Sequence, residues 1–264
     1  MLTISLAEKI EKNEKIQLPV KESSKSQLIG KLRYWWCWLV AAIMILLIGA
    51  PALVILWLIN RRTWLYPLAE VGAKVWLRAC GARVSVRGLE NLDPRKSYIF
   101  VSNHRSYLDT AVLFAYTGRR MSIVAKKELL KIPIFGQGMG FVNVIAIDRS
   151  NPEKAFESIE KTKELLNRGY SVGFFAEGTR AMPGELLPFK KGAFYLAIQT
   201  KTPIVPVAIK NTDWMMGKKS GTAFPGVIEM ILLPPVETYD MKIEEVSVLA
   251  KKVRESIALE LAEL

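Results

Sequence analysis

The stretch "SYIFVSNHRSYLDT", from Ser97 to Thr110, runs from an apolar segment through a polar turn into the start of a helix. Its apolar part predicts a buried strand, and residues 106–117 predict a helix. His104, the only histidine in the chain, follows that strand directly. Because α/β proteins place their sites at the carboxyl ends of strands, His104 is expected at a functional edge. Taken alone, the stretch also fits a capping or surface histidine.

Strand-like and helix-like segments alternate on both sides of this stretch. The strand-like segments are "ARVSVRG", "MSIVA", "VNVIAID", "SVGFF", "TPIVPVAI" and "GVIEMILL". Asn151 and Pro152 suit the cap and first turn of a helix that ends near Gly169, and a last helix is expected from Glu244 to Leu261. Strands separated by helices predict the α/β class, with a mixed, largely parallel sheet flanked by helices.

The composition indicates a folded protein with an anionic partner. A chain of 264 residues, 50% of them apolar, is long enough for one α/β domain and an appendage. Lysine and arginine outnumber aspartate and glutamate 37 to 25, which favours a membrane surface, a nucleic acid or a phosphorylated substrate. Cys37 and Cys80 lie far apart in dissimilar surroundings, so we expect no structural disulfide and, with one histidine, no metal site.

The longest apolar run extends from Tyr34 to Ile59 and contains no charged residue. As a continuous helix it would measure about 39 Å, more than the roughly 30 Å of a bilayer's hydrocarbon core. The length of the run and the polar residues that precede it argue against a cleaved signal peptide. We therefore expect the protein to be held in a membrane. Four tryptophans near the ends of the run are typical of interfacial anchors: Trp35, Trp36, Trp38 and Trp57.

Two arrangements of this run remain open. Gly49 and Pro51 lie inside it, and a proline kinks or breaks a helix. Basic residues flank both ends, so the positive-inside rule assigns no orientation. A single transmembrane span fits the length, whereas a re-entrant hairpin fits the proline and the two basic flanks.

Four regions are expected along the chain. Residues 1–33 form a polar N-terminal segment, and residues 34–60 form the membrane-embedded helix or hairpin. Residues 61–81 form an interfacial or linking helix, with Gly81 in the position of a left-handed cap. The α/β domain occupies residues 82–264.

His104 and Asp109 form a candidate catalytic pair. A neutral imidazole, with an ordinary pKa of about 6.5, is suited to general-base catalysis at cytoplasmic pH. A carboxylate behind the ring can hold the second N–H and stabilise the imidazolium. On a regular helix, residues five apart lie about 140° apart around the axis. The pair can therefore meet only if His104 lies before the helix.

A second group of polar residues follows the segment "SVGFF". Its members are Glu177, Gly178, Thr179 and Arg180. An arginine in a glycine-containing turn suits phosphate, because the guanidinium binds oxyanions bidentately and glycine lets backbone amides approach. Lys190 and Lys191 add positive charge at the start of the next helix. The alternative is a surface turn with solvated charges.

Lys126 and Arg149 are further basic candidates, on either side of the glycines in "GQGMG". These glycines lack the preceding strand and the spacing of a dinucleotide-binding fingerprint, so we interpret them as turns. "GYSVG" matches the string of a serine-hydrolase nucleophile elbow, but a helix precedes it and a strand follows it. An elbow needs the reverse order, so Ser171 is expected to open a strand.

Four segments, in this order, resemble the motifs of the glycerolipid acyltransferase family, whose bacterial members acylate lysophosphatidic acid. "NHRSYLD" is similar to the motif N-H-x-x-x-x-D, and "GFVNVIAIDR" resembles the second motif. "FFAEGTR" is similar to the third, with Ala176 where the family usually has proline, and "IVPVAI" resembles the fourth. The resemblance covers residues 87–233.

The resemblance implies a glycerol-3-phosphate acyltransferase-like fold for residues 82–264 and a transferase that makes phosphatidic acid from lysophosphatidic acid. His104 would act as the base and Asp109 would orient it, while the substrate's phosphate would meet Arg180, Arg149 and Lys126. Glu177, Gly178 and Thr179 would complete the binding turn. The expected co-substrate is acyl-CoA or acyl carrier protein, with no further cofactor and no metal.

The resemblance also implies a location and partners. We expect a bilayer with anionic lipids as the partner, no nucleic acid, and a position on the cytoplasmic face of a membrane, as in the bacterial inner membrane. Two alternatives stay open. The acceptor could be glycerol 3-phosphate or a different lysolipid, or the chain could be a non-catalytic adaptor that holds anionic lipid.

Overall fold

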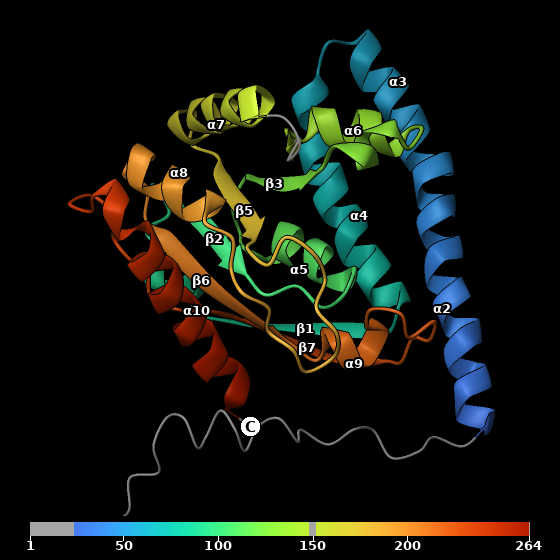
Figure 1. The fold of residues 1–264 in the computed structure, drawn as a ribbon. Helices are drawn as coiled ribbons and strands as arrows, with labels where there is room; N and C mark the ends of the chain where they lie inside the picture. Colours follow the sequence, from blue (N-terminus) through green and yellow to red (C-terminus); the bar gives the residue numbers. More distant parts are fainter. Residues whose placement is uncertain (1–23, 148–151, 264) are drawn as a thin grey trace, which may run out of the picture.

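The computed structural model describes residues 24–147 and 152–263. Its centre is a seven-stranded sheet in the order β1-β7-β6-β2-β5-β3-β4 (Figure 1). The strands are β1 (Ala82–Arg87), β2 (Ile99–Ser102), β3 (Met121–Lys126), β4 (Ile145–Ile147), β5 (Ser171–Phe175), β6 (Ile204–Lys210) and β7 (Gly226–Leu232). All neighbouring strands are parallel except β6 and β7. The predicted α/β class with a mixed, largely parallel sheet is confirmed.

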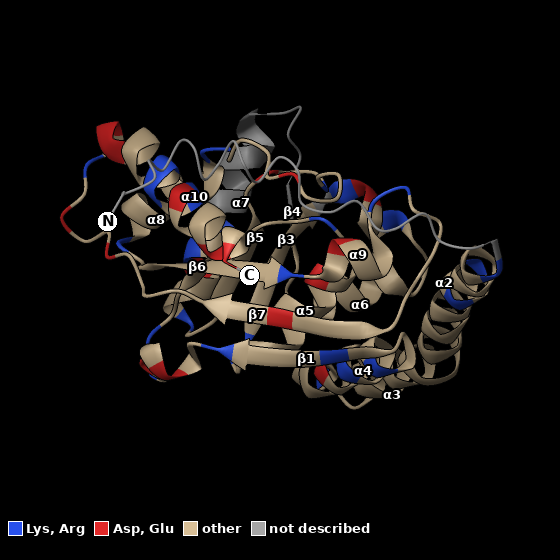
Figure 2. Cartoon of the chain, turned by 90° about the horizontal axis from the view of Figure 1, so that it is seen from below, with Lys and Arg blue, Asp and Glu red and all other residues tan. Residues whose placement is uncertain are grey.

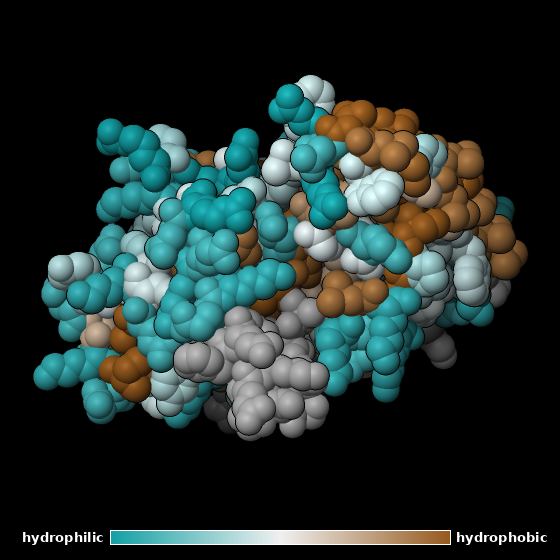
Figure 3. Space-filling model, turned by 90° about the horizontal axis from the view of Figure 1, so that it is seen from above, coloured by the Kyte–Doolittle hydropathy of each residue, from teal (hydrophilic) through white to brown (hydrophobic). Residues whose placement is uncertain are grey.

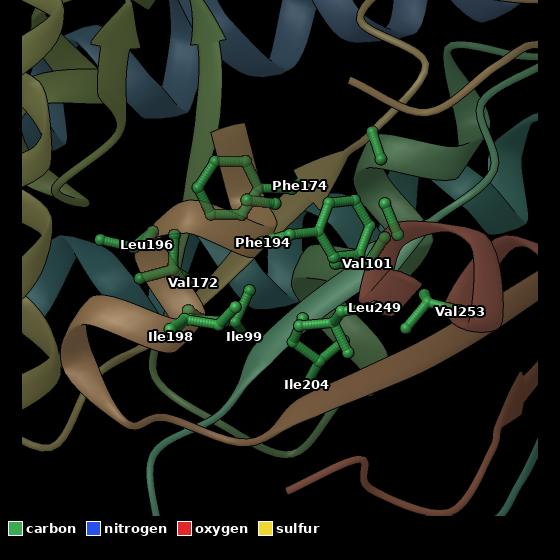
Figure 4. Close-up of a cluster of buried hydrophobic side chains, with 14 of the residues drawn as sticks. Ile99, Val101, Val172, Phe174, Phe194, Leu196, Ile198, Ile204, Leu249 and Val253 are labelled. Carbon is green, nitrogen blue, oxygen red and sulfur yellow. The ribbon is translucent and has the colours of Figure 1, made fainter. Parts of the chain in front are cut away.

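Helices cover both faces of the sheet. They are α4 (Leu65–Ala79), α5 (Leu108–Tyr116), α6 (Phe135–Phe141), α7 (Pro152–Asn167), α8 (Gly192–Thr200), α9 (Thr212–Met216) and α10 (Val246–Ala262). On one face, α7, α8 and α10 pack over β2, β5 and β6, where Phe194 and Leu249 lie among the strand residues (Figure 4). On the other face, α4, α5 and α9 pack over the same sheet.

Strand β2 occupies the middle of the sheet, between β5 and β6. Ile99 and Val101 point into one core and Phe100 into the other, and all three are fully buried. A strand that is covered on both faces reads as a continuous apolar run, which is why "YIFV" does not alternate. Because β2 and β5 are parallel, the residues that follow Ser102 and Phe175 leave the sheet at the same edge.

The long apolar run is one continuous helix. It consists of α2 (Ser24–Met44), a π-helical turn η2 (Ile45–Gly49) and α3 (Ala50–Leu58). Gly49 keeps helical dihedrals, and Pro51, which has no backbone N–H, lies in the first turn of α3, directly after the π-helical turn. The turn that a re-entrant hairpin requires near Pro51 is therefore not formed. Lys25–Leu58 is long and apolar enough to cross a membrane, by length and composition.

The chain reverses after this helix, and α4 returns beside it (Figure 1). The turn contains Asn60, which has a φ of 54°. Two tryptophans join the helices, because the indole of Trp76 donates to the carbonyl of Cys37 and that of Trp36 donates to the carbonyl of Ala79. Gly81 ends the returning segment at a φ of 83°, which confirms the predicted left-handed cap.

Apolar side chains gather on one side of the molecule, over the long helix (Figure 3). Leu47 is 71% exposed and Leu58 is 67% exposed. The basic residues of α2 lie toward its N-terminal end, and the rest of the helix carries no charge (Figure 2). Monomeric soluble proteins rarely expose an apolar patch of this extent, which marks it as an interaction surface.

One sequence interpretation is wrong. The glycines of "GQGMG" lie in helix α6 rather than in turns, and Gly136 is required there because a Cβ would lie 2.1 Å from the carbonyl oxygen of Leu130. Cys37, inside α2, and Cys80, directly after α4, are buried in one apolar cluster. Both are free thiols.

Candidate active site

His104 and Asp109 face each other at the carboxyl end of β2. The ring Nδ1 of His104 lies 3.0 Å from Oδ2 of Asp109. Helix α5 begins at Leu108, so His104 precedes it and the geometric requirement for the pair is met. The His104 side chain is 16% exposed, whereas that of Asp109 is fully buried. The carboxylate is therefore screened from water while the ring remains accessible.

Asp109 also shapes the turn that carries His104. Its Oδ2 accepts hydrogen bonds from the backbone N–H groups of Arg105 and Ser106, each at 2.7 Å. A carboxylate in the first turn of a helix also interacts favourably with the helix dipole. The five-residue spacing thus places one oxygen where it binds both the ring and the turn. This leaves Oδ1 of Asp109 buried without a protein partner among the described residues.

Two polar residues beside the histidine hold this edge of the sheet together. The Asn103 side chain donates to the carbonyl of Ile209 and accepts from the N–H of the same residue, at 2.9 and 2.8 Å. The Ser106 hydroxyl donates to the carbonyl of Met216 at 2.7 Å. Neither role is predicted by the sequence pattern. The sequence does contain one indication of such roles. Polar residues follow directly after a buried apolar strand, and buried polar groups are normally hydrogen-bonded.

Phe175, the last residue of β5, stacks on the histidine ring. The two ring centroids are 4.0 Å apart and the ring planes differ by 21°. This contact and the Asp109 hydrogen bond restrict the rotation of the imidazole from two sides. Nδ1 is occupied by Asp109, so Nε2 is the ring nitrogen that a ligand can reach.

Glu177 connects the second group of predicted residues to the first. Its Oε1 accepts from the backbone N–H of His104 at 2.7 Å, and its Oε2 accepts from the N–H of Leu187 at 2.8 Å. The side chain is almost completely buried. Burial raises the pKa of the Glu177 carboxyl above its ordinary value, and the two backbone hydrogen bonds oppose this rise. Glu177 therefore fixes the turn behind the histidine.

The glycine turn brings Arg180 to the same edge of the sheet. Gly178 has a φ of 72°, and its N–H donates to the carbonyl of Phe175. Thr179 is exposed, and Arg180 is half-buried with its Cζ 3.6 Å from the centre of the Tyr107 ring. The N–H of Ala181 donates to the carbonyl of His104 at 2.7 Å, so the turn is bonded directly to the segment that carries the histidine.

Arg105 stabilises the loop that follows Arg180. Its guanidinium donates to the carbonyls of Glu185 and Gly184, at 2.7 and 3.1 Å, and lies 3.2 Å from a carboxylate oxygen of Asp213. These contacts are largely buried, where charge-assisted hydrogen bonds are strong. This role of Arg105 is not predicted by the sequence pattern either. Arg105, which belongs to the histidine motif, thus stabilises the loop that follows the motif containing Arg180.

The other two predicted basic residues are not placed. Arg149 and the side chain of Lys126 lie outside the described residues. No cluster of three His, Cys, Asp or Glu side chains that could hold a metal ion occurs in residues 24–147 and 152–263. The described part of the site therefore consists of an imidazole–carboxylate pair, a structural glutamate and an accessible guanidinium.

A family model for acyltransferases matches residues 83–210, a segment that contains every one of these candidate residues. Residues 83–210 form an acyltransferase-family domain. Its sheet edge after β2 carries the histidine motif, and the turn after β5 carries the arginine. The family resemblance expected from the motifs is confirmed.

Curated relatives have a more specific name. The chain is 38% identical over 178 residues to 1-acyl-sn-glycerol-3-phosphate acyltransferase alpha of Bos taurus, which covers 67% of this chain and 62% of that protein. It is 36% identical over 187 residues to 1-acyl-sn-glycerol-3-phosphate acyltransferase of Saccharomyces cerevisiae, covering 70% of this chain and 61% of that protein. The alignments span less than two thirds of these relatives.

A solved structure resembles the chain over most of its length. It is the crystal structure of the 1-acyl-sn-glycerophosphate (LPA) acyltransferase, PlsC, from Thermotoga maritima, with a TM-score of 0.76 and 25% sequence identity. The match covers 90% of this chain and 99% of that one. The expected acyltransferase-like fold is thereby confirmed.

An apolar groove of about 560 Å³ lies away from these residues, between α3 and α6. Leu53, Trp57 and Phe141 contribute to its walls, and Arg62 lies at its rim over the Phe141 ring. Of the candidate site residues that the structure describes, none lines it. The groove is therefore separate from the sheet edge that carries His104 and Arg180.

Proposed function

We propose that the chain is a membrane-bound O-acyltransferase that moves a fatty acyl group to the sn-2 hydroxyl of lysophosphatidic acid and so produces phosphatidic acid. The observation that carries this proposal is the contact between His104 Nδ1 and Asp109 Oδ2. It leaves Nε2 as the proton acceptor at an accessible edge of the sheet. The acceptor class is supported by the names of the relatives.

The transfer needs no covalent acyl-enzyme, because a thioester is already activated. His104 Nε2 removes the proton of the acceptor hydroxyl as that oxygen attacks the thioester carbonyl carbon. Asp109 stabilises the imidazolium that forms. The C–S bond then breaks, the new ester remains, and the imidazolium returns the proton to the leaving thiolate. The histidine is neutral again at the end, and all atoms of the ester and the free thiol come from the two substrates.

We propose that Arg180 binds the phosphate of the acceptor. Among the described residues its guanidinium has no ion-pair partner, and it lies on the same turn as Glu177, which contacts the backbone of His104. A planar guanidinium suits bidentate contact with a phosphate. Lys126 and Arg149 remain proposed partners of the same anion.

The acyl donor is proposed to be acyl-CoA or acyl carrier protein, with no further cofactor. The carbonyl oxygen of its thioester becomes an oxyanion during the attack and needs hydrogen-bond donors. The N–H groups of Arg105 and Ser106 already donate to Asp109, and that of Gly178 donates to Phe175. The oxyanion must therefore accept from other groups.

We propose that the long apolar helix places this site at the surface of a bilayer. A lysophospholipid stays in the membrane, so an enzyme that acts on it must reach the headgroup region. The exposed apolar side chains of α2 and α3 support burial in lipid, and the net charge of +12 favours anionic headgroups. The cytoplasmic face, as of a bacterial inner membrane, is the proposed side.

The test is a transfer assay with the purified full chain in phospholipid vesicles. Labelled acyl-CoA and acyl carrier protein are supplied separately with a panel of lysophospholipids and glycerol 3-phosphate, and the products are identified by mass. We expect phosphatidic acid from lysophosphatidic acid, with the activity lost in His104→Ala while the thermal unfolding temperature is unchanged.

Other results would replace this proposal. If a product forms only from glycerol 3-phosphate, or only from a different lysolipid, that compound is the acceptor and the protein is still an acyltransferase. No product from any donor and acceptor, together with vesicle binding that His104→Ala leaves intact, would favour a non-catalytic adaptor for anionic lipid.

A further inference from the structure

The guanidinium of Arg180 lies directly over an aromatic ring. Its Cζ is 3.6 Å from the centre of the Tyr107 ring, which is close packing of two planar groups. The N–H donors of a guanidinium lie in its plane. Stacking on one face therefore holds the group in place and leaves the donors at its edges free for an anion.

Tyr107 lies within the histidine motif, and a second aromatic contact orients its ring. It precedes the first residue of α5 and lies between His104 and Asp109 in sequence. Its ring is 43% exposed, so burial in the core does not orient it. A second aromatic contact does so, because the Trp38 ring meets it edge-on, with centroids 5.1 Å apart and planes at 82°.

Trp38 belongs to the long apolar helix. Its ring also packs beside those of Tyr34 and Trp76, at centroid distances of 6.2 and 6.3 Å. Trp76 is in turn hydrogen-bonded to the carbonyl of Cys37. A continuous row of aromatic contacts thus leads from the apolar helices to the guanidinium of Arg180.

We infer that Tyr107 and Trp38 are positioning residues for the acceptor's phosphate: the Tyr107 ring holds Arg180 flat, and Trp38 of the apolar helix holds Tyr107. This inference rests on the proposed role of Arg180 in phosphate binding. Its consequence is that the apolar helix helps to form the substrate site as well as to attach the protein to lipid. The position of α2 against the domain and the affinity of Arg180 for the phosphate are then coupled.

Removing either ring is expected to weaken binding of the acceptor and to leave the rate of the chemical step nearly unchanged. Cation–π contacts of this kind correspond to about a five- to thirtyfold change in affinity. Tyr107→Leu and Trp38→Leu are expected to raise the KM for lysophosphatidic acid within this range and to leave kcat within about threefold, because His104 and Asp109 are untouched. Tyr107→Phe and Trp38→Phe keep a ring and should restore most of the affinity.

Trp35→Leu is the matched control. Trp35 lies on the same helix, is 69% exposed and meets the ring of Tyr34 rather than that of Tyr107. Trp35→Leu therefore removes a more exposed indole from the same helix without touching the contact between Tyr107 and Arg180. Each variant is assayed for transfer and, in the His104→Ala background, for displacement of a fluorescent lysophosphatidic acid from the full chain in vesicles.

The two readouts separate this inference from the proposed function. The inference is supported if Trp38→Leu and Tyr107→Leu weaken displacement while Trp35→Leu and the phenylalanine variants do not. It is overturned if Trp38→Leu and Trp35→Leu weaken binding equally, or if neither leucine variant of the row changes it. Absence of transfer by the unmutated chain would contradict the proposed function alone, since the displacement readout does not depend on turnover.

Discussion

The carboxylate of Glu177 lies 2.7 Å from the backbone nitrogen of His104 and accepts its N–H. This hydrogen bond joins two motifs that are 73 residues apart in the chain. The second carboxylate oxygen accepts from the N–H of Leu187, so one buried side chain fixes both the catalytic turn and the loop beyond Arg180. Glu177 therefore acts on the architecture of the site, and its substitution should change stability and activity together.

Glu177→Ala is expected to destabilise the protein and to abolish most of the transfer. It leaves the N–H groups of His104 and Leu187 without their partners, at a cost of about 1–3 kcal/mol for each donor that stays buried. The free energy of unfolding is measured in urea, and transfer is measured in vesicles. Glu237→Ala, at an exposed position, serves as the control. Equal stability of the two variants would contradict the role of Glu177.

The raised pKa of Glu177 predicts a pH dependence of stability. Between the ordinary pKa of 4.5 and the higher folded-state pKa, the native protein holds a proton that the unfolded chain has released. The stability that this group contributes is therefore largest at low pH and falls as the pH rises through the folded-state pKa. We expect the free energy of unfolding of the wild type, relative to Glu177→Gln, to decrease over this interval. A difference that stays constant or increases with pH would exclude the burial effect.

Asp109→Asn should lower kcat strongly with little effect on the KM for the acceptor. The amide offers one acceptor oxygen where Oδ2 now serves the ring and two backbone N–H groups, and its NH₂ group can favour the wrong imidazole tautomer. A loss of about 10²–10⁴-fold in kcat is expected. Asp240→Asn, at an exposed aspartate, should keep full activity. A kcat within threefold of wild type would remove Asp109 from the mechanism.

The contact between His104 and Asp109 was predictable from sequence because its geometry is local. One strand, one turn and one helix start decide whether His104 meets Asp109, and the spacing itself required a histidine before the helix. The strand pattern was predictable for the same reason, since each buried strand is an apolar run between turn residues. The order of the strands in the sheet was not assigned, because pairing between distant segments leaves no local pattern.

Contacts between distant segments account for what was missed. No periodicity indicates that Arg105 reaches Asp213, or that Trp38 meets Tyr107, because these contacts depend on how the finished elements pack. Pro51 was expected to kink or break the helix, and a π-helical turn before it keeps the helix continuous. The glycines of α6 resemble turn residues in the sequence, because the close backbone approach at Gly136 arises only in the folded chain.

Gly88→Ala is expected to destabilise the acyltransferase domain more than Gly118→Ala. Both glycines have positive φ, 87° and 66°, so both variants incur the left-handed strain of roughly 1–2 kcal/mol. At Gly88 the added Cβ would also lie 1.9 Å from the carbonyl oxygen of Leu232, whereas nothing lies within 4 Å at Gly118. Overpacking adds about 1–3 kcal/mol. Urea unfolding of the two variants gives the difference, and equal losses would contradict the close approach of β7.

The exposed face of the apolar helix predicts where a charge will detach the protein from lipid. Leu47 is 71% exposed on the uncharged part of the helix, and Val248 is 66% exposed on α10. An aspartate in the centre of a membrane-embedded helix costs about 2.5–3.5 kcal/mol. Leu47→Asp should therefore lower the fraction of protein that floats with phospholipid vesicles on a density gradient, whereas Val248→Asp should leave it unchanged. The same fraction for both variants would mean that this face of the helix does not enter the bilayer.

Because the site is proposed to act on a lipid that stays in the membrane, Leu47→Asp should also lower transfer to vesicle-bound lysophosphatidic acid, with less effect on acceptor dissolved in detergent micelles.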